Sequence, residues 1–247
     1  MRLVAAVAFL LAAIWFGFVK NDWLDSRPTQ RMLFLGHSYT YYNDMPAMVA
    51  KMADSADSPV HYDITMSAFP NATLKDHWHN RKTRALLAQG GWDRVILQPE
   101  GGFTPSDTNS SQYVYGSKLL AGTSQERPAI IINWLATEGF YRQHYSTTRS
   151  EDAEIDQSSL RGLAYAVGAD VIDIASVWDR VKADQLPFSL YKDGNHPSLE
   201  GSYLAALVVY AGLSHDDVTK VTYVPWRMSG SDAKLLRERV QASLAGS

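Results

Sequence analysis

The sequence contains no cysteine. This absence excludes disulfide bonds, thiolate-bound metals, a cysteine nucleophile and a bacterial lipoprotein anchor, although it does not identify the cellular compartment. Positive charge is not in excess either, because 23 lysines and arginines stand against 26 aspartates and glutamates, a formal net charge of −3. Without a basic field, no nucleic acid is expected as a partner. Internal repeats and low-complexity segments are also absent.

An uncharged, mostly apolar run covers residues 3–19. Its length is at the lower limit for spanning a bilayer, and no clean small-residue cleavage site stands out. We therefore expect residues 1–25 to be an uncleaved signal anchor, with a cleaved signal peptide or a buried core helix as alternatives. The anchor predicts an exported protein, periplasmic or otherwise extracytoplasmic, held at the membrane by residues 3–19. The remaining residues, 26–247, are expected to fold as one domain.

From residue 31 onward, short apolar strands alternate with amphipathic helices. Strands are predicted at 32–35, 60–66, 94–98, 129–133 and 171–174, and helices at about 46–56, 73–89, after 111, 160–167, 197–211 and 229–245. The repeated order of strand and helix predicts an α/β fold, a three-layer α/β/α sandwich around a mostly parallel sheet of about five strands. Ligands bind beyond the carboxyl ends of such strands, so the residues that follow each strand are site candidates.

Two motifs at opposite ends of the chain carry the chemistry of a serine hydrolase. Residues 36–40 read Gly-His-Ser-Tyr-Thr after the first strand, and residues 193–197 read Asp-Gly-Asn-His-Pro. A serine hydroxyl needs a neighbouring base, which the neutral imidazole of His196 can supply. Asp193 is close enough in a tight turn to accept the Nδ1 proton and fix the tautomer. Ser38 is therefore predicted to be the nucleophile, although alone it would indicate only a helix cap or a turn.

These two motifs resemble the first and last blocks of the SGNH (GDSL-type) hydrolases. Residues 193–206 resemble most closely a poorly characterised bacterial branch of that superfamily, and residues 70–74 and 95–98 match its middle blocks more loosely. The similarity spans about residues 31–213. It implies a flavodoxin-like α/β/α fold and an esterase that uses a serine nucleophile, with neither a cofactor nor a metal.

The resemblance also implies an oxyanion hole made by the serine N–H, a glycine N–H and an asparagine side chain. This chain departs from the pattern twice, with Asn71 in place of the glycine and Gln98 in place of the asparagine. Asparagine tolerates a left-handed backbone better than most residues, and glutamine retains the carboxamide. We therefore expect Ser38, Asn71 and Gln98 to form the hole, with Asn133 as a rival amide donor.

The substrate is less closely defined than the triad. The export signal and the resemblance imply an O-acetyl or short acyl ester on a glycan or another envelope component, cleaved through an acyl-Ser38 intermediate. An acyltransferase that uses the same triad on a sugar hydroxyl and a non-catalytic glycan-binding module remain alternatives, and the oligomeric state is open. Several aromatic residues near strand ends could stack on sugar rings or belong to the core and rim: Tyr39, Tyr41, Tyr42, Phe103, Trp134, Phe140 and Tyr141.

A second Asp-x-x-His spacing occurs at residues 76–79, which read Asp-His-Trp-His. It lies inside a predicted helix, where His77 and His79 point to different faces. We therefore expect neither a zinc site nor a second triad there, and we expect His77 to pack or hydrogen-bond beneath the Asn71 loop as structural support.

Overall fold

The computed structural model describes residues 26–100, 107–121, 123, 126–144 and 148–246. The hydrophobic helix predicted over residues 3–19 lies outside this part of the chain. Within the part that is described, none of the helices combines the length and apolar character needed to cross a bilayer.

A five-stranded sheet forms the centre of the fold, with the order β2-β1-β3-β4-β5 and all neighbouring strands parallel. The strands are β1 (Thr29–Gly36), β2 (His61–Ala68), β3 (Arg94–Leu97), β4 (Ala129–Ile132) and β5 (Asp170–Asp173). This is the strand order of flavodoxin-like folds. The chain first adds β2 on one side of β1 and then adds β3, β4 and β5 on the other side, so the strand order switches between β1 and β3. The predicted parallel sheet is confirmed.

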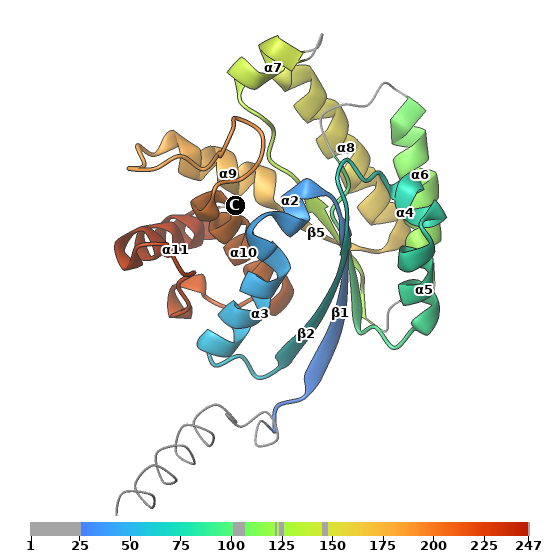
Figure 1. Cartoon of the computed structure of the whole chain (residues 1–247), viewed down its shortest axis with the longest axis horizontal. Helices are drawn as coiled ribbons and strands as arrows, with labels where there is room; N and C mark the ends of the chain where they lie inside the picture. The colour runs from blue at the N-terminus through green and yellow to red at the C-terminus, as the bar shows by residue number, and fades with distance from the viewer. Residues whose placement is uncertain (1–25, 101–106, 122, 124–125, 145–147, 247) are drawn as a thin grey trace, which may run out of the picture.

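Helices cover both faces of the sheet, as Figure 1 shows. One face carries α3 (Met45–Ser55), α9 (Ile174–Ala183), α10 (Leu199–Ser214) and α11 (Gly230–Ala245), and the other carries α4 (Leu74–His79), α5 (Arg81–Gln89), α6 (Asp107–Leu120) and α8 (Arg149–Val167). Short elements complete the fold: α2 (Ser38–Tyr41), η1 (Tyr42–Asp44), α7 (Glu138–His144) and η2 (Val218–Lys220).

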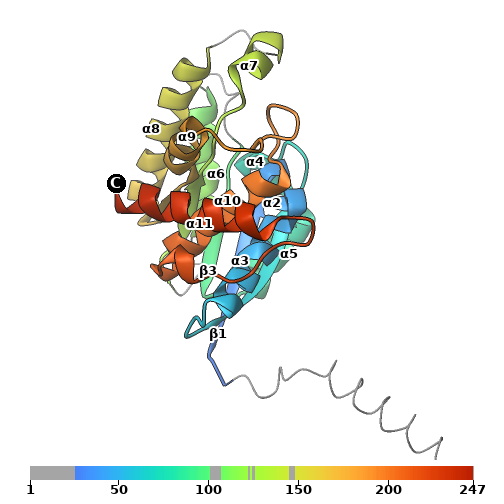
Figure 2. The ribbon, with the colours of Figure 1, turned by 90° about the vertical axis from the view of Figure 1, so that its left-hand side faces the viewer.

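The apolar run of β1 is explained by these two layers. Met32 and Phe34 belong to one core cluster, whereas Leu33 and Leu35 belong to the other. Successive side chains of a strand point to opposite faces, so a strand covered on both sides must be apolar at every position. Figure 2 shows why α10 is also buried along most of its length: α11 packs on its outer side.

The helix predicted over residues 73–89 is instead two helices, α4 and α5. The break is at Asn80, whose backbone is extended and whose side-chain Oδ1 accepts a hydrogen bond from Thr83 N at 3.1 Å. Asparagine competes with the helical backbone in this way and favours caps over helix interiors. The period of the apolar residues did not reveal the cap.

The helix predicted to begin at Pro197 begins two residues later, at Leu199. Ser198 is its cap, because its Oγ accepts a hydrogen bond from Gly201 N at 3.0 Å. Pro197 instead forms an isolated antiparallel bridge with Tyr191. His196 therefore precedes the helix and its cap, and it is held by the turn that begins at Asp193.

Candidate active site

Ser38 lies at the carboxyl edge of the sheet, as the first residue of α2, directly after β1 (Figure 1). The sharp step from strand to helix depends on Gly36. A Cβ on Gly36 would lie 1.9 Å from Thr40 Oγ1, and therefore only glycine leaves room for Thr40 to fold back over the strand end. The same Thr40 Oγ1 accepts a hydrogen bond from His37 N at 3.2 Å, which fixes the start of the helix.

Asp193 and His196 face each other across a tight turn. The Nδ1 of His196 lies 2.8 Å from Asp193 Oδ2, while Asp193 Oδ1 accepts hydrogen bonds from His196 N at 2.7 Å and Asn195 N at 3.0 Å. Gly194 completes the turn with φ at 87°, a left-handed conformation that glycine adopts without strain. Partial burial raises the pKa of the Asp193 carboxyl, but the hydrogen bonds from His196 and Asn195 outweigh it and hold the pKa below its usual value. The carboxylate is therefore charged at neutral pH and can orient the imidazole.

Two tyrosines that follow Ser38 in the sequence, one in α2 and one at the start of η1, contact this turn. The ring of Tyr42 stacks on the ring of His196, with centroids 4.5 Å apart and planes at 9°. The hydroxyl of Tyr39 donates a hydrogen bond to Asn195 Oδ1. The contacts of these described residues include no direct hydrogen bond between Ser38 and His196. Catalytic hydrogen bonds of this kind often tighten only around a bound substrate.

Gln98 belongs to a buried chain of hydrogen bonds beneath α2. Its side chain is only 1% exposed. Thr40 Oγ1 donates to Gln98 Oε1 at 2.6 Å, and Gln98 Nε2 donates to Asn133 Oδ1 at 2.7 Å. Asn133 Nδ2 in turn donates to Pro99 O at 2.5 Å and lies 3.3 Å from His37 Nε2. The segments that follow β1, β3 and β4 are thus connected to one another beneath α2.

His37 is the titratable member of this buried cluster. Burial lowers its pKa from 6.5 to about 3, against a hydrogen bond with the Pro99 backbone that acts in the opposite direction. The ring is therefore neutral at any pH at which the enzyme would work. A neutral ring fits a site packed against uncharged amides, where a charge would lack compensation.

We expect His37 to make the protein less stable in mild acid. Its folded-state pKa of about 3 lies below the 6.5 of the unfolded chain, so the unfolded state binds the extra proton. Its contribution is complete above pH 6.5 and is lost as the pH falls toward 3. Between pH 7 and pH 5 the loss is about 2 kcal/mol. Urea unfolding at both pH values should show His37→Gln losing about that much less than the wild type, and equal losses would contradict the prediction.

Asn71 follows β2 on an exposed turn and has φ at 53°, within the left-handed region. Asparagine is among the few non-glycine residues that adopt this conformation readily. The backbone at this position thus has the geometry for which a glycine would otherwise be needed. The rival residue Asn133 has both ends of its amide occupied within the buried hydrogen-bond chain.

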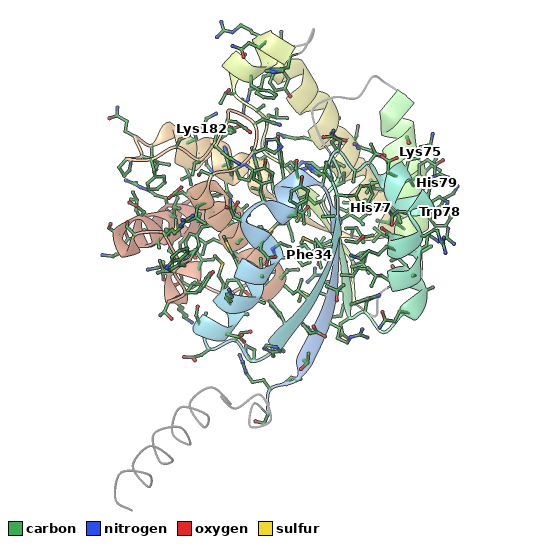
Figure 3. The ribbon with its side chains drawn as sticks, in the orientation of Figure 1. Phe34, Lys75, His77, Trp78, His79 and Lys182 are labelled. Atoms are coloured by element: carbon green, nitrogen blue, oxygen red, sulfur yellow. The ribbon has the colours of Figure 1, made fainter. Side chains whose placement is uncertain are left out.

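His77 packs beneath the segment that leads to Ser38 and supports it. Its Nε2 lies 2.9 Å from Gly36 O, its Nδ1 lies 3.1 Å from Thr83 Oγ1, and its ring packs against Phe69 in the Asn71 loop. Figure 3 shows His77 on the inner side of α4 and His79 on its outer side. The two histidines therefore point to different faces, as predicted, and His77 packs where it was expected. In the described part of the chain no group of three or more acidic, histidine or cysteine residues could hold a metal.

The aromatic residues near the strand ends divide into core and rim. Tyr39, Trp134 and Tyr141 are buried, whereas Tyr41, Tyr42 and Phe140 are partly exposed around the site. Phe103 lies outside the described residues. A separate hollow of about 620 Å³ runs along β5 between α9, α10 and α11, and none of the candidate catalytic residues lines it.

No protein-family model and no curated protein matches the sequence. Several solved structures do match the fold. A proposed SGNH hydrolase from Slackia heliotrinireducens is 25% identical, with 75% of this chain and 99% of that chain covered and a TM-score of 0.62. A DUF4886 family protein from Bacteroides uniformis is 14% identical, with coverage of 88% and 95% and a TM-score of 0.72.

Two further structures carry activities in their names. The acetylxylan esterase Axe2 from Geobacillus stearothermophilus is 12% identical, with 81% of this chain and 99% of that chain covered and a TM-score of 0.57. A lipase/acylhydrolase from Enterococcus faecalis is 14% identical, with coverage of 75% and 96% and a TM-score of 0.59.

The parallel sheet and its two helical layers define a three-layer α/β/α protein. Within that class, the chain has the fold of the SGNH hydrolase superfamily, which confirms the resemblance predicted from the motifs at 36–40 and 193–197.

Proposed function

We propose that this protein is a carboxylic ester hydrolase in which Ser38 is the nucleophile. The hydrogen bond between Asp193 Oδ2 and His196 Nδ1, 2.8 Å long and beside the α2 helix that Ser38 begins, carries the proposal. In this mechanism His196 Nε2 takes the proton of the Ser38 hydroxyl while Oγ attacks the ester carbonyl. The same proton then passes to the departing alcohol, which leaves an acyl-Ser38 ester. Water, activated by His196, releases the acid and restores the serine.

The oxyanion of the tetrahedral intermediates is bound, in this proposal, by three N–H groups. They belong to the Ser38 backbone, the Asn71 backbone and the side chain of Gln98. A primary amide has two N–H bonds, and Asn133 accepts one of those of Gln98. The other N–H of Gln98 is assigned to the oxyanion. The hydrogen bond from Thr40 to Gln98 Oε1 holds the amide in one orientation and supports this assignment.

The substrate that we propose is an O-acetyl or short acyl group on a glycan or another envelope component. The acetylxylan esterase with the same fold supports an acetylated sugar, and the partly exposed ring of Tyr41 at the rim suits stacking on a sugar face. The neighbouring ring of Tyr42 is already stacked on His196, and that of Phe140 on His144. The esterase assignment does not depend on location, and export of this chain remains a prediction from residues 3–19.

Acetate release from an O-acetylated oligosaccharide tests the function. We expect the purified protein to release acetate and the deacetylated sugar in equal amounts without any acceptor. Acetate transfer to an added sugar, with no release in its absence, would instead identify an acyltransferase. Binding of the oligosaccharide without turnover, and without covalent labelling by a fluorophosphonate, would identify a glycan-binding module and overturn the proposal.

Removing the Gln98 side chain should slow the chemical step. We expect Gln98→Ala to lower kcat by about 10²- to 10³-fold, the usual cost of losing one oxyanion donor. It also leaves the hydroxyl proton of Thr40 and the Oδ1 of Asn133 without a partner, which costs about 1–3 kcal/mol for each buried group. Steady-state kinetics should therefore be measured below the melting temperature of the variant.

Gln112→Ala provides the matched control, since Gln112 is also buried but donates its hydrogen bond to Glu100 O. It should lose stability and retain kcat. If Gln98→Ala loses stability to a similar extent with an unchanged kcat, Gln98 is only structural and the oxyanion donor is another group.

A further inference from the structure

A side-chain hydrogen bond between the two motifs at 36–40 and 193–197 is made by a residue that takes no part in the proposed chemistry. Tyr39 immediately follows Ser38, and its hydroxyl donates a hydrogen bond to Asn195 Oδ1. Asn195 lies between Asp193 and His196, and its own N–H donates to Asp193 Oδ1 at 3.0 Å. The neighbour of the nucleophile is thus bonded to the turn that holds the base.

The ring of Tyr39 is fixed as firmly as its hydroxyl. It is 7% exposed and stacks on Trp134, with centroids 4.3 Å apart and planes at 11°. Trp134 stacks in turn on Trp178, at 4.2 Å and 7°, inside the core. The indole Nε1 of Trp134 donates to Asn195 O at 3.3 Å, so the same aromatic stack holds Asn195 from a second direction.

The hydrogen bond of the Tyr39 hydroxyl restrains the turn in a way that ring stacking does not. The Tyr42 ring restrains the tilt of the His196 imidazole by stacking, but stacked rings can slide over each other. A hydrogen bond has a preferred length and direction. The bond from Tyr39 to Asn195 therefore sets how far the turn lies from α2, and with it the distance between Ser38 Oγ and His196 Nε2.

We propose that Tyr39 is a positioning residue that holds the acid–base turn at the distance from Ser38 needed for proton transfer. It acts through Asn195 and touches neither substrate nor reacting atoms. This inference rests on the proposed serine esterase function. Displacements of about 1 Å at a reacting group can cost 10²-fold in rate, so loss of one hydroxyl here should reduce kcat although the ring remains in place.

Tyr39→Phe tests the proposal because it removes only the hydroxyl. We expect kcat on an acetyl ester to fall by about 10- to 100-fold with KM changed less than twofold, and the rate of fluorophosphonate labelling to fall in parallel. Asn195→Ala should show a similar loss. The double variant should lose no more than the larger single effect, because both changes remove the same bond.

Tyr203→Phe is the matched control. Tyr203 is also buried, in the first half of α10, but its hydroxyl donates to Tyr223 O at 2.9 Å and accepts from Arg237 rather than contacting the turn at 193–196. This control should lose stability without losing kcat. A Tyr39→Phe enzyme within twofold of the wild-type kcat, or multiplying effects in the double variant, would overturn the positioning role while leaving the esterase intact. If Ser38→Ala also retains full activity, the proposed function itself has failed.

Discussion

Replacing Ser38 with alanine should lower kcat for ester hydrolysis by about a million-fold, as in serine hydrolases that lose their nucleophile. The acyl intermediate cannot form without Oγ, and only binding and oxyanion stabilisation remain to accelerate attack by water. The fold should survive, because alanine fits the first position of α2, and the hydrogen bonds that fix this start are made by His37, Thr40 and Gln98. The measurement is kcat on an activated acetyl ester, together with covalent labelling by a fluorophosphonate.

Ser67→Ala is the matched control for this variant. Ser67 is also a buried serine near the carboxyl end of a strand, here β2, but its Oγ is bonded to Thr83 Oγ1 at 2.9 Å. It should retain labelling and kcat, while Ser38→Ala loses both. Labelling of Ser38→Ala at the wild-type rate, with peptide mapping to a different residue, would show that the nucleophile is elsewhere.

Four of the five strands could be predicted because each contains a compact apolar run that ends at a polar residue or a glycine, whereas β2 was predicted from its alternating pattern. β1 is the clearest case, since its residues pack alternately into two different core clusters and must all be apolar. Helix boundaries were harder to predict. The break at Asn80 and the start of α10 after Ser198 both depend on one side chain that caps the backbone, and apolar periodicity carries no signal for it.

The triad candidates could be predicted because they occur in local motifs, whereas the contacts between them could not. Asp193 and His196 are three residues apart, so one turn suffices to join them. The bond from Tyr39 to Asn195 crosses 156 positions of the sequence, and the buried chain through Gln98, Asn133 and His37 joins three strands. Such contacts depend on how the strands are ordered in the sheet. The sequence therefore left Tyr39 and Trp134 open between sugar stacking and the core, and the structure places both in the core.

Asp193→Asn is the second substitution from which we expect a large loss, about 10⁴-fold in kcat. The Oδ1 position of the asparagine can still accept the hydrogen bonds from His196 N and Asn195 N, so the turn should keep its shape. The group facing His196 Nδ1 changes, however, from a carboxylate oxygen that accepts a hydrogen bond to an amide N–H that donates one. The imidazole is then held in the tautomer whose Nε2 carries the hydrogen and cannot accept the proton of Ser38. Loss of the negative charge also removes the stabilisation of the imidazolium that forms during attack.

The kinetic pattern separates this orienting role from a purely structural one. Asp193→Asn should lower kcat with KM nearly unchanged and should lower the free energy of unfolding at neutral pH only slightly, because the lowered pKa of Asp193 shows that its charged form stabilises the fold. Asp217→Asn is the matched control, because Asp217 likewise accepts a backbone hydrogen bond, from Thr219 N at 2.8 Å, but faces no histidine. It should retain full kcat. An Asp193→Asn enzyme that keeps more than about a tenth of the wild-type kcat, far above the 10⁴-fold loss expected of a triad carboxylate, would mean that His196 acts without this carboxylate.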